Sequence, residues 1–211
     1  MDSVPFRYDP ARCALVVIDM QNDFCSPEGS LAHAGFDVTA AVAMTPRLNQ
    51  LIATARTAGV RVIFVRTEHD ETTDTRQWLG RVGDGPDTAR TGITCRTGTA
   101  GADYYGVTPR SGDVVVTKNR FSAFVGTNLD LTLRSLGIDS LLFTGVATEI
   151  CVESSLRSAL FHEYWVSLVD DCAATYSRAA HDASVSVVAQ NFGTVVTAEK
   201  LESFWSTVSP G

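Results

Sequence analysis

Short apolar runs alternate along the chain with longer segments in which apolar residues recur at helical spacing. The runs that we expect to form strands are residues 14–18, 61–67, 114–117, 140–144, 165–169 and 194–196. They are apolar almost throughout instead of alternating with polar residues, which is typical of strands buried on both faces of a parallel sheet. The pattern therefore predicts six strands of that kind.

The segments between these runs predict the crossover helices. Residues 38–58 carry apolar residues at helical spacing and stop at Gly59, and 128–136 stop at Gly137. Further helices are expected after Cys151, over 178–191 and at the end of the chain. Alternating strands and helices predict an α/β fold, with a doubly wound, mainly parallel six-stranded sheet and helices on both faces. Its functional site is expected at the carboxyl ends of the strands.

Composition narrows the class of protein. The 211 residues are 45% hydrophobic without a break in composition, so we expect one domain over residues 1–211. A formal charge of −7 argues against nucleic acid or an anionic membrane surface as partner, because both attract a basic patch. The first residues lack the pattern of a secretory signal, and no apolar run has membrane-spanning length. We therefore expect a soluble cytoplasmic protein.

Cysteine usage fits a reducing compartment. The five cysteines are an odd number, widely scattered and without a CxxC pair, which favours free thiols over disulfides or a thiolate zinc site. Cys13 and Cys172 are expected to be core residues. The polar connection over residues 68–112 is long for a compact domain, and such connections are usually functional, for example as a lid or a subunit contact.

Three chemically capable side chains follow different predicted strands. Asp19 follows the first strand, Lys118 the third, and Cys151 lies beyond the fourth, so a parallel sheet gathers them at one edge. A cysteine supplies a nucleophile, an aspartate accepts and returns its proton, and a lysine favours both anions. Together they suit attack on an amide-type carbonyl. Taken singly, each has a plain alternative: Cys151 as a core thiol, Asp19 as a loop cap and Lys118 as a solvated charge.

The turn before Cys151 adds two expectations. A thiol in the first turn of a helix feels the positive end of the helix dipole, which predicts a lowered pKa for Cys151. The backbone N–H groups of Ala147 and Cys151 are placed to stabilise a tetrahedral oxyanion, and Gly145 permits the sharp turn.

Residues 17–24, 118–124 and 145–155 resemble the three signature segments of the isochorismatase-like cysteine hydrolases. The resemblance covers about residues 11–200. It implies that Asp19 is the general base, Lys118 its electrostatic partner and Cys151 the nucleophile, which forms a thioester and releases ammonia or an amine. It also implies a cis peptide between Val146 and Ala147, with the Ala147 N–H in the oxyanion hole. Isochorismatases proper lack the cysteine, so the family resemblance favours an amide or ureido substrate.

Nicotinamidases of the same family hold a metal through an Asp-x-His pair and a further His. This chain has Glu68-His69-Asp70 and no second His nearby, so we predict neither a metal nor an organic cofactor. His69 with Glu68 or Asp70 remains a possible ion or substrate contact, but a solvated loop cluster is favoured because open metal sites normally need three protein ligands. No role is assigned to the remaining histidines, which are His33, His162 and His181.

Residues 35–38, 118–122 and 147–154 are most similar to the ureidoacrylate amidohydrolases. Substrate choice is expected to lie with side chains that face the pocket. We predict an apolar wall of four aromatic residues, Phe24, Trp78, Phe121 and Phe124. Arg120 or Arg76 is a candidate for a substrate carboxylate, the alternative for either being a solvent-facing arginine.

The leading hypothesis is a cysteine-dependent amidohydrolase that cleaves the terminal carbamoyl or carboxamide C–N bond of a small molecule, of the ureidoacrylate, biuret or N-carbamoyl type. A nicotinamidase-like or broader amidase is the alternative. A catalytically idle binding or structural subunit is a third hypothesis, disfavoured because a chain freed from catalysis has no physical reason to keep a buried charged pair beside a thiol. The resemblance also implies a homo-oligomer, a dimer or a tetramer.

Overall fold

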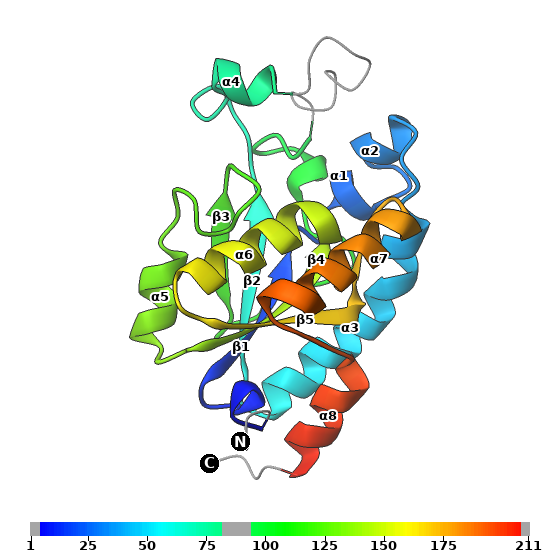
Figure 1. Ribbon diagram of the computed structural model, residues 1–211. Helices are drawn as coiled ribbons and strands as arrows, with labels where there is room; N and C mark the ends of the chain where they lie inside the picture. Colours follow the sequence, from blue (N-terminus) through cyan, green and yellow to red (C-terminus); the bar gives the residue numbers. More distant parts are fainter. Residues whose placement is uncertain (1–4, 82–93, 208–211) are drawn as a thin grey trace.

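The computed structural model describes residues 5–81 and 94–207. Within these residues one all-parallel sheet has the strand order β3-β2-β1-β4-β5-β6 (Figure 1). Its strands are β1 (Cys13–Ile18), β2 (Arg61–Thr67), β3 (Val114–Lys118), β4 (Ser140–Val146), β5 (Trp165–Ala174) and β6 (Thr194–Val196). The predicted α/β class and strand number are confirmed, and the sheet is parallel throughout.

Helical segments connect the strands and cover the sheet. The longer helices are α3 (Thr39–Thr57), α5 (Leu129–Ser135), α6 (Glu153–Phe161), α7 (Arg178–Val187) and α8 (Ala198–Thr207). Short helices are η1 (Pro5–Tyr8), α1 (Asn22–Cys25), α2 (Ser30–His33), α4 (Arg76–Leu79) and η3 (Ala100–Ala102). Two π-helical turns, η4 (Thr148–Val152) and η5 (Val188–Phe192), precede α6 and follow α7. The helix predicted over residues 178–191 is therefore α7 together with η5.

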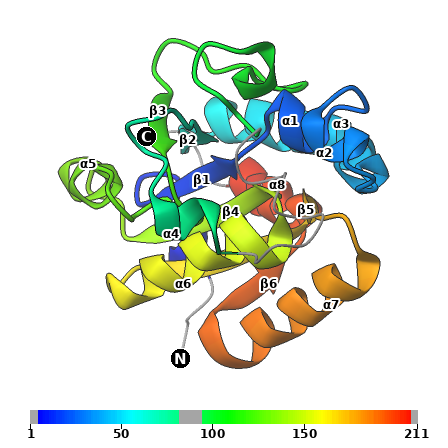
Figure 2. The same cartoon turned by 90° about the horizontal axis from the view of Figure 1, so that it is seen from above.

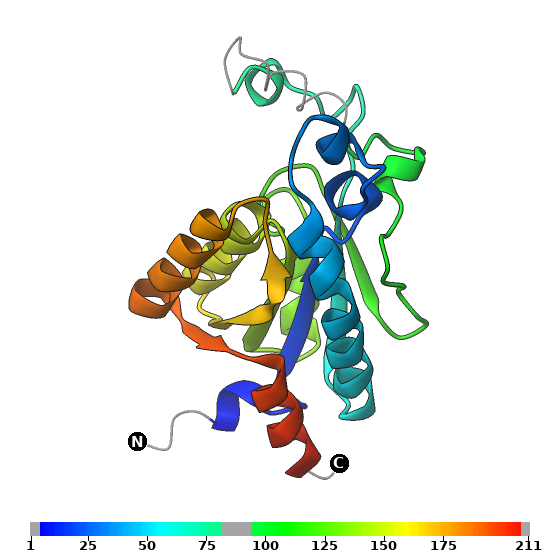
Figure 3. The ribbon, with the colours of Figure 1, turned by 90° about the vertical axis from the view of Figure 1, so that its right-hand side faces the viewer.

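The continuous apolar strands separate two buried clusters. On β1, Leu15 belongs to the cluster beneath α3 and α8, whereas its neighbour Val16 belongs to the cluster beneath α5, α6 and η5. Successive side chains of a strand point to opposite faces, so both faces must be apolar when both are covered. Figure 2 shows α6 and α7 on one side of the strands and α3 on the other, and Figure 3 shows the same layers from the side.

The fifth strand is longer than its predicted span of residues 165–169. The polar pair Asp170-Asp171 follows that span directly, but β5 continues through the pair and the buried Cys172 to Ala174. The pairing with β4 is irregular here, since Phe143 faces Leu168 while Gly145 faces Ala173. The bulge accommodates the extra residues of β5, which include the two aspartates. Asp170 is partly buried and Asp171 is exposed, so neither charge is forced into the core and the strand continues beyond them.

Free thiols are confirmed at all five cysteines, and Cys13 and Cys172 are fully buried in the core as expected. Among the described residues, no helix combines the length and apolar character needed to cross a membrane. The short helices α1, α2 and α4 lie above the carboxyl ends of the strands (Figure 1). This edge of the sheet is where the predicted site residues converge.

Candidate active site

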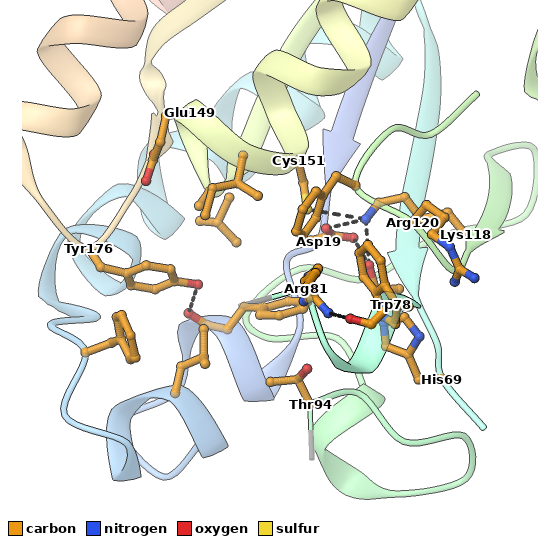
Figure 4. A pocket seen from close by; sticks show the side chains of 18 of the residues that line it. Asp19, His69, Trp78, Arg81, Thr94, Lys118, Arg120, Glu149, Cys151 and Tyr176 are labelled. Atoms are coloured by element: carbon orange, nitrogen blue, oxygen red, sulfur yellow. Dashed lines mark hydrogen bonds and ion pairs between the residues drawn. The ribbon is translucent and has the colours of Figure 1, made fainter. Parts of the chain in front are cut away.

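The side chains of Asp19, Lys118 and Cys151 meet at the carboxyl edge of the sheet (Figure 4). Lys118 Nζ lies 2.7 Å from Asp19 Oδ2 and donates a hydrogen bond to Cys151 Sγ over 3.4 Å. Asp19 and Lys118 are 1% exposed and Cys151 is 8% exposed. The convergence expected from their strand-end positions is therefore present in the structure.

The backbone around Asp19 requires a glycine on the neighbouring strand. Asp19 has a left-handed backbone with φ of 52°, which turns the chain out of the sheet while its N–H still donates to Val65. Gly145 pairs with Ile18, and a Cβ at Gly145 would lie 2.0 Å from the Ile18 carbonyl oxygen. With φ of 101° as well, this position admits glycine alone. Gly145 thus allows β1 and β4 to approach closely beside Asp19.

Thr67 joins the lysine and the aspartate, a contact that the sequence reasoning missed. Its hydroxyl accepts a hydrogen bond from Lys118 Nζ over 2.6 Å and donates one to Asp19 Oδ1 over 3.0 Å. Thr67 pairs with Lys118 in the sheet and is 4% exposed. The available signal was its place as the last residue of the second predicted strand, since strand ends share this edge.

The turn that carries Cys151 begins at a cis peptide. The bond between Val146 and Ala147 is cis, at the position that the family resemblance implied. The Ala147 carbonyl then accepts hydrogen bonds from the N–H groups of Ile150 and Val152, which forms the wide turn η4. Cys151 therefore sits in a π-helical turn in front of α6, not in the first turn of a regular α-helix.

A second hydrogen-bond network also holds η4. His181 Nδ1 lies 2.9 Å from Thr148 Oγ1, and His181 Nε2 lies 2.9 Å from Asp170 Oδ1. Thr148 is fully buried and follows Ala147 directly. His181, to which the sequence reasoning assigned no role, thus ties the cysteine-bearing turn to β5, and no pattern along the chain marks this long-range contact.

The expected lowering of the Cys151 pKa is wrong for this geometry. Burial raises the pKa of the thiol, Lys118 opposes that rise, and Asp19 adds to it. The desolvation of a thiolate outweighs the benefit of a helix N-terminus. Cys151 is therefore a neutral thiol at rest, and an adjacent base must remove its proton when it reacts.

Lys118 is held in its charged form. Burial by itself would lower its pKa, but the contact with Asp19 raises it above its ordinary value. An ammonium ion at this position offsets the negative charge that passes between carboxylate and sulfur. The site is thus arranged for proton transfer from Cys151 to Asp19 with Lys118 beside both.

A cavity of about 490 Å³ opens beside these side chains. Phe24, Trp78, Phe121 and Arg120 line it, as do Ala147 and Cys151. The remaining aromatic candidate, Phe124, is wrongly placed by the sequence reasoning. Its ring stacks on His162, with 5.1 Å between ring centroids, because the chain after β3 turns back towards the far end of α6.

The two candidate arginines behave differently. Arg120 lines the cavity, with its guanidinium 4.8 Å from the centre of the Trp78 ring and hydrogen bonds to the carbonyls of Thr73 and Asn119. Arg76 is exposed on α4 and does not line the cavity. Arg81, which the sequence reasoning missed, lies over Trp78 at 3.7 Å and does line it. Its signal was its place in the long 68–112 connection, of which residues 82–93 are outside the described residues.

His69 is a buried cavity residue, so the favoured assignment to a solvated loop cluster is wrong. It is 4% exposed, and its Nδ1 accepts or donates no hydrogen bond among the described residues. Burial, with Lys118, Arg120 and Arg96 adding to it against Asp74, lowers its pKa to about 4. It is thus neutral near pH 7. The main chain places it here, since its N–H donates to Cys95.

The neighbours of His69 have other partners. Glu68 forms an ion pair with Arg66 at 2.7 Å, and Asp70 accepts hydrogen bonds from Thr72 and Thr73. Within residues 5–81 and 94–207, no group of three or more His, Cys, Asp or Glu side chains is arranged to hold a metal ion.

Comparison with known proteins agrees with this geometry. The family model described as the isochorismatase domain matches residues 13–200. The chain belongs to the isochorismatase family. Among curated members, ureidoacrylate amidohydrolase RutB of Klebsiella pneumoniae is 35% identical over 219 aligned positions, which cover 96% of this chain and 89% of that protein.

Solved structures of isochorismatase-like proteins share the fold. A cysteine hydrolase from Pseudomonas syringae has a TM-score of 0.81 and 26% identity, with 94% of each chain covered. N-carbamoylsarcosine amidase from Thermoplasma acidophilum has a TM-score of 0.71 and 28% identity, with 89% of this chain and 97% of that chain covered.

Proposed function

We propose that this isochorismatase-family protein is a cysteine-dependent amidohydrolase, which cleaves the terminal carbamoyl or carboxamide C–N bond of a small molecule. The observation that carries the proposal is the buried group of Asp19, Lys118 and Cys151 at the wall of a 490 Å³ cavity. The names of its relatives support it, since they include a ureidoacrylate amidohydrolase and an N-carbamoylsarcosine amidase. A cavity of this size suits a small substrate, not a polymer.

In the proposed mechanism Asp19 removes the proton from Cys151 as the sulfur attacks the carbonyl carbon of the substrate. The N–H groups of Ala147 and Cys151 stabilise the negative oxygen of the tetrahedral intermediate. Asp19 returns its proton to the departing nitrogen, which leaves as ammonia, and a thioester remains on Cys151. Water, deprotonated by Asp19, then attacks the thioester carbon and the C–S bond breaks. The acid product leaves, and Asp19 returns the proton to the Cys151 sulfur, which restores the free thiol.

Lys118 and Thr67 keep this aspartate in place during both halves of the reaction. Lys118 contacts both the base and the nucleophile, so its positive charge favours whichever of them carries the negative charge. Burial raises the pKa of the Cys151 thiol, so the proposed mechanism couples removal of its proton to attack on the substrate. No step of this mechanism calls on a metal ion or an organic cofactor.

The rest of the proposal concerns substrate and assembly. We expect a ureidoacrylate-, biuret- or N-carbamoyl-type substrate, contacted by Phe24, Trp78 and Phe121, with any carboxylate near Arg120. The chain is expected to act as one domain over residues 1–211, to form a homo-oligomer and to work in the cytoplasm. A role of the 68–112 connection as a lid or subunit contact remains a prediction.

The proposal is tested by measuring ammonia release from a panel of amides. The panel contains ureidoacrylate, biuret, N-carbamoyl amino acids, nicotinamide and simple aliphatic amides. Turnover confined to the ureido and carbamoyl compounds would support the proposed class, and turnover confined to nicotinamide would replace it with a nicotinamidase. If the protein released ammonia from none of them while Cys151 reacted with iodoacetamide no faster than an ordinary buried thiol, the protein would not be an amidohydrolase of this class.

A further inference from the structure

Glu149 is a cavity residue with half of its carboxylate unused. It lies two residues before Cys151 and lines the same cavity. Its Oε1 atom accepts a hydrogen bond from Thr175 Oγ1 over 3.0 Å. Its Oε2 atom is buried and accepts no hydrogen bond within the described residues.

A buried carboxylate oxygen without a donor needs an explanation. Leaving such a polar atom unpaired forfeits its hydration without replacing it, and native proteins rarely keep one without a reason. The hydrogen bond from Thr175 shows that Oε1 anchors the segment after β5. It does not explain why Oε2 has no donor. A ligand in the cavity that Glu149 lines would supply such a donor when the side chain turns Oε2 from its buried position towards that ligand.

Within residues 5–81 and 94–207, the surroundings of Glu149 provide no such donor. Tyr176, on the same side of the cavity, donates its hydroxyl to the carbonyl of Phe24 over 3.3 Å, and burial raises its pKa well above the ordinary value. The ring of Phe36 packs edge-on against Tyr176, with 5.4 Å between centroids. This wall is thus aromatic, with one carboxylate in it.

The two sides of the cavity differ in charge. Glu149 and Tyr176 lie on one side of Cys151, and Arg81 and Trp78 lie on the other (Figure 4). Arg120 also packs on Trp78, so the second side carries two guanidinium groups over one indole ring. A ligand that spans the cavity therefore meets a carboxylate at one end and cations at the other.

We infer that Glu149 is a specificity-determining residue that accepts a hydrogen bond from an N–H group of the substrate. The chemical class is a small amide that carries an amino, ureido or guanidino nitrogen at the end facing Tyr176. The negative charge of Glu149 repels a substrate carboxylate, which is therefore expected to face Arg81 and Arg120. The inference rests on the proposed function, since it assumes that substrates bind beside Cys151.

Binding to the Cys151→Ala protein tests the inference without turnover. The probes are ω-amino amides of increasing chain length, each paired with its methyl-terminated isostere and with the ω-carboxylate amide of matching length. Isothermal titration calorimetry is expected to show that the best amino amide binds at least tenfold more tightly than its isostere. Glu149→Leu in the same background should abolish that preference, and Glu149→Gln should reduce it.

Thr175→Val is the matched control, since it removes the hydrogen bond to Oε1 and leaves Oε2 in place. It should keep most of the preference for the amine. Three results would overturn the inference. They are equal binding of amines and isosteres, no measurable binding of any amino amide, and a preference for the amine that survives Glu149→Leu. Equal losses in Glu149→Leu and Thr175→Val, for amines and isosteres alike, would show that Glu149 is only an anchor.

The outcome is separable from that of the proposed function. If the wild-type protein releases no ammonia from any amide while the binding preference is present, the amidohydrolase proposal fails and the role of Glu149 stands. If amides are hydrolysed but the binding preference is absent, the amidohydrolase stands and the role of Glu149 fails. Circular dichroism of each variant confirms that the compared proteins are folded.

Discussion

The ammonium group of Lys118 lies 2.7 Å from the carboxylate of Asp19, and both side chains are 1% exposed. Removing two charges from water is costly, so a pair of this kind is stable only where good geometry and further hydrogen bonds compensate. Thr67 supplies them by accepting from Lys118 and donating to Asp19. The proposed base is therefore a carboxyl group that two neighbours hold in place inside the protein.

Replacing Asp19 with asparagine is expected to lower kcat/KM about 10²- to 10⁴-fold, because a positioned general base contributes about that much. It should also lower the free energy of unfolding by about 3 kcal/mol, since Lys118 then keeps an uncompensated buried charge. Ammonia release and urea denaturation measure the two effects.

The double variant Asp19→Asn with Lys118→Met separates the loss of activity from the loss of stability. It removes the orphaned charge, so it should be more stable than Asp19→Asn alone and remain as inactive. Near-normal turnover in Asp19→Asn would mean that another group takes the proton from the thiol.

Replacing Gly145 with alanine is expected to destabilise the protein by about 3 kcal/mol or more. The added Cβ would lie 2.0 Å from the Ile18 carbonyl oxygen, so β1 and β4 would have to separate beside Asp19. Gly59→Ala is the matched control: it has a positive φ of 83° but no atom within 4 Å of the new Cβ, and it should cost about 1 kcal/mol. Urea denaturation measures both, and equal losses in the two variants would show that strand contact at Gly145 is unimportant.

The lowered pKa of His69 predicts a specific loss of stability in acid. Its pKa is about 4 in the folded protein against an ordinary value of 6.5, so between these pH values the unfolded chain binds the extra proton. Stability then falls as the pH drops below about 6.5 and continues to fall until the pH reaches about 4. The free energy of unfolding of the wild type should therefore decrease more between pH 7 and pH 5 than that of His69→Gln. Parallel pH profiles of the two proteins would contradict the burial of a neutral His69.

The sequence predicts the sheet and the group of Asp19, Lys118 and Cys151 because both depend on local patterns. Unbroken apolar runs indicate buried parallel strands, and polar residues at their ends must share an edge whatever the loops do. Resemblance to a known family placed the cis peptide at Val146-Ala147, which no local pattern indicates.

The predictions that are wrong concern features that depend on tertiary contacts. The bulge in β5 depends on its pairing with β4, so the apolar run at 165–169 does not show that the strand continues through residues 170–171. Phe124 has the same apolar character as Phe121, and only the path of the chain after β3 places it on His162 instead of in the cavity. The Cys151 pKa depends on burial, which position at a helix start does not predict. In the sequence Glu149 is only one residue of a signature segment, and the structure shows that it lines the cavity.

The central claim, that Cys151 is the nucleophile, is tested most directly by ammonia release from the best panel substrate with the wild type and with Cys151→Ala. The substitution removes only the sulfur from a buried position, so circular dichroism should show an unchanged fold. We predict that Cys151→Ala releases ammonia at less than a thousandth of the wild-type rate, because the proposed thioester needs the Cys151 sulfur. Release at a rate close to that of the wild type would contradict the account.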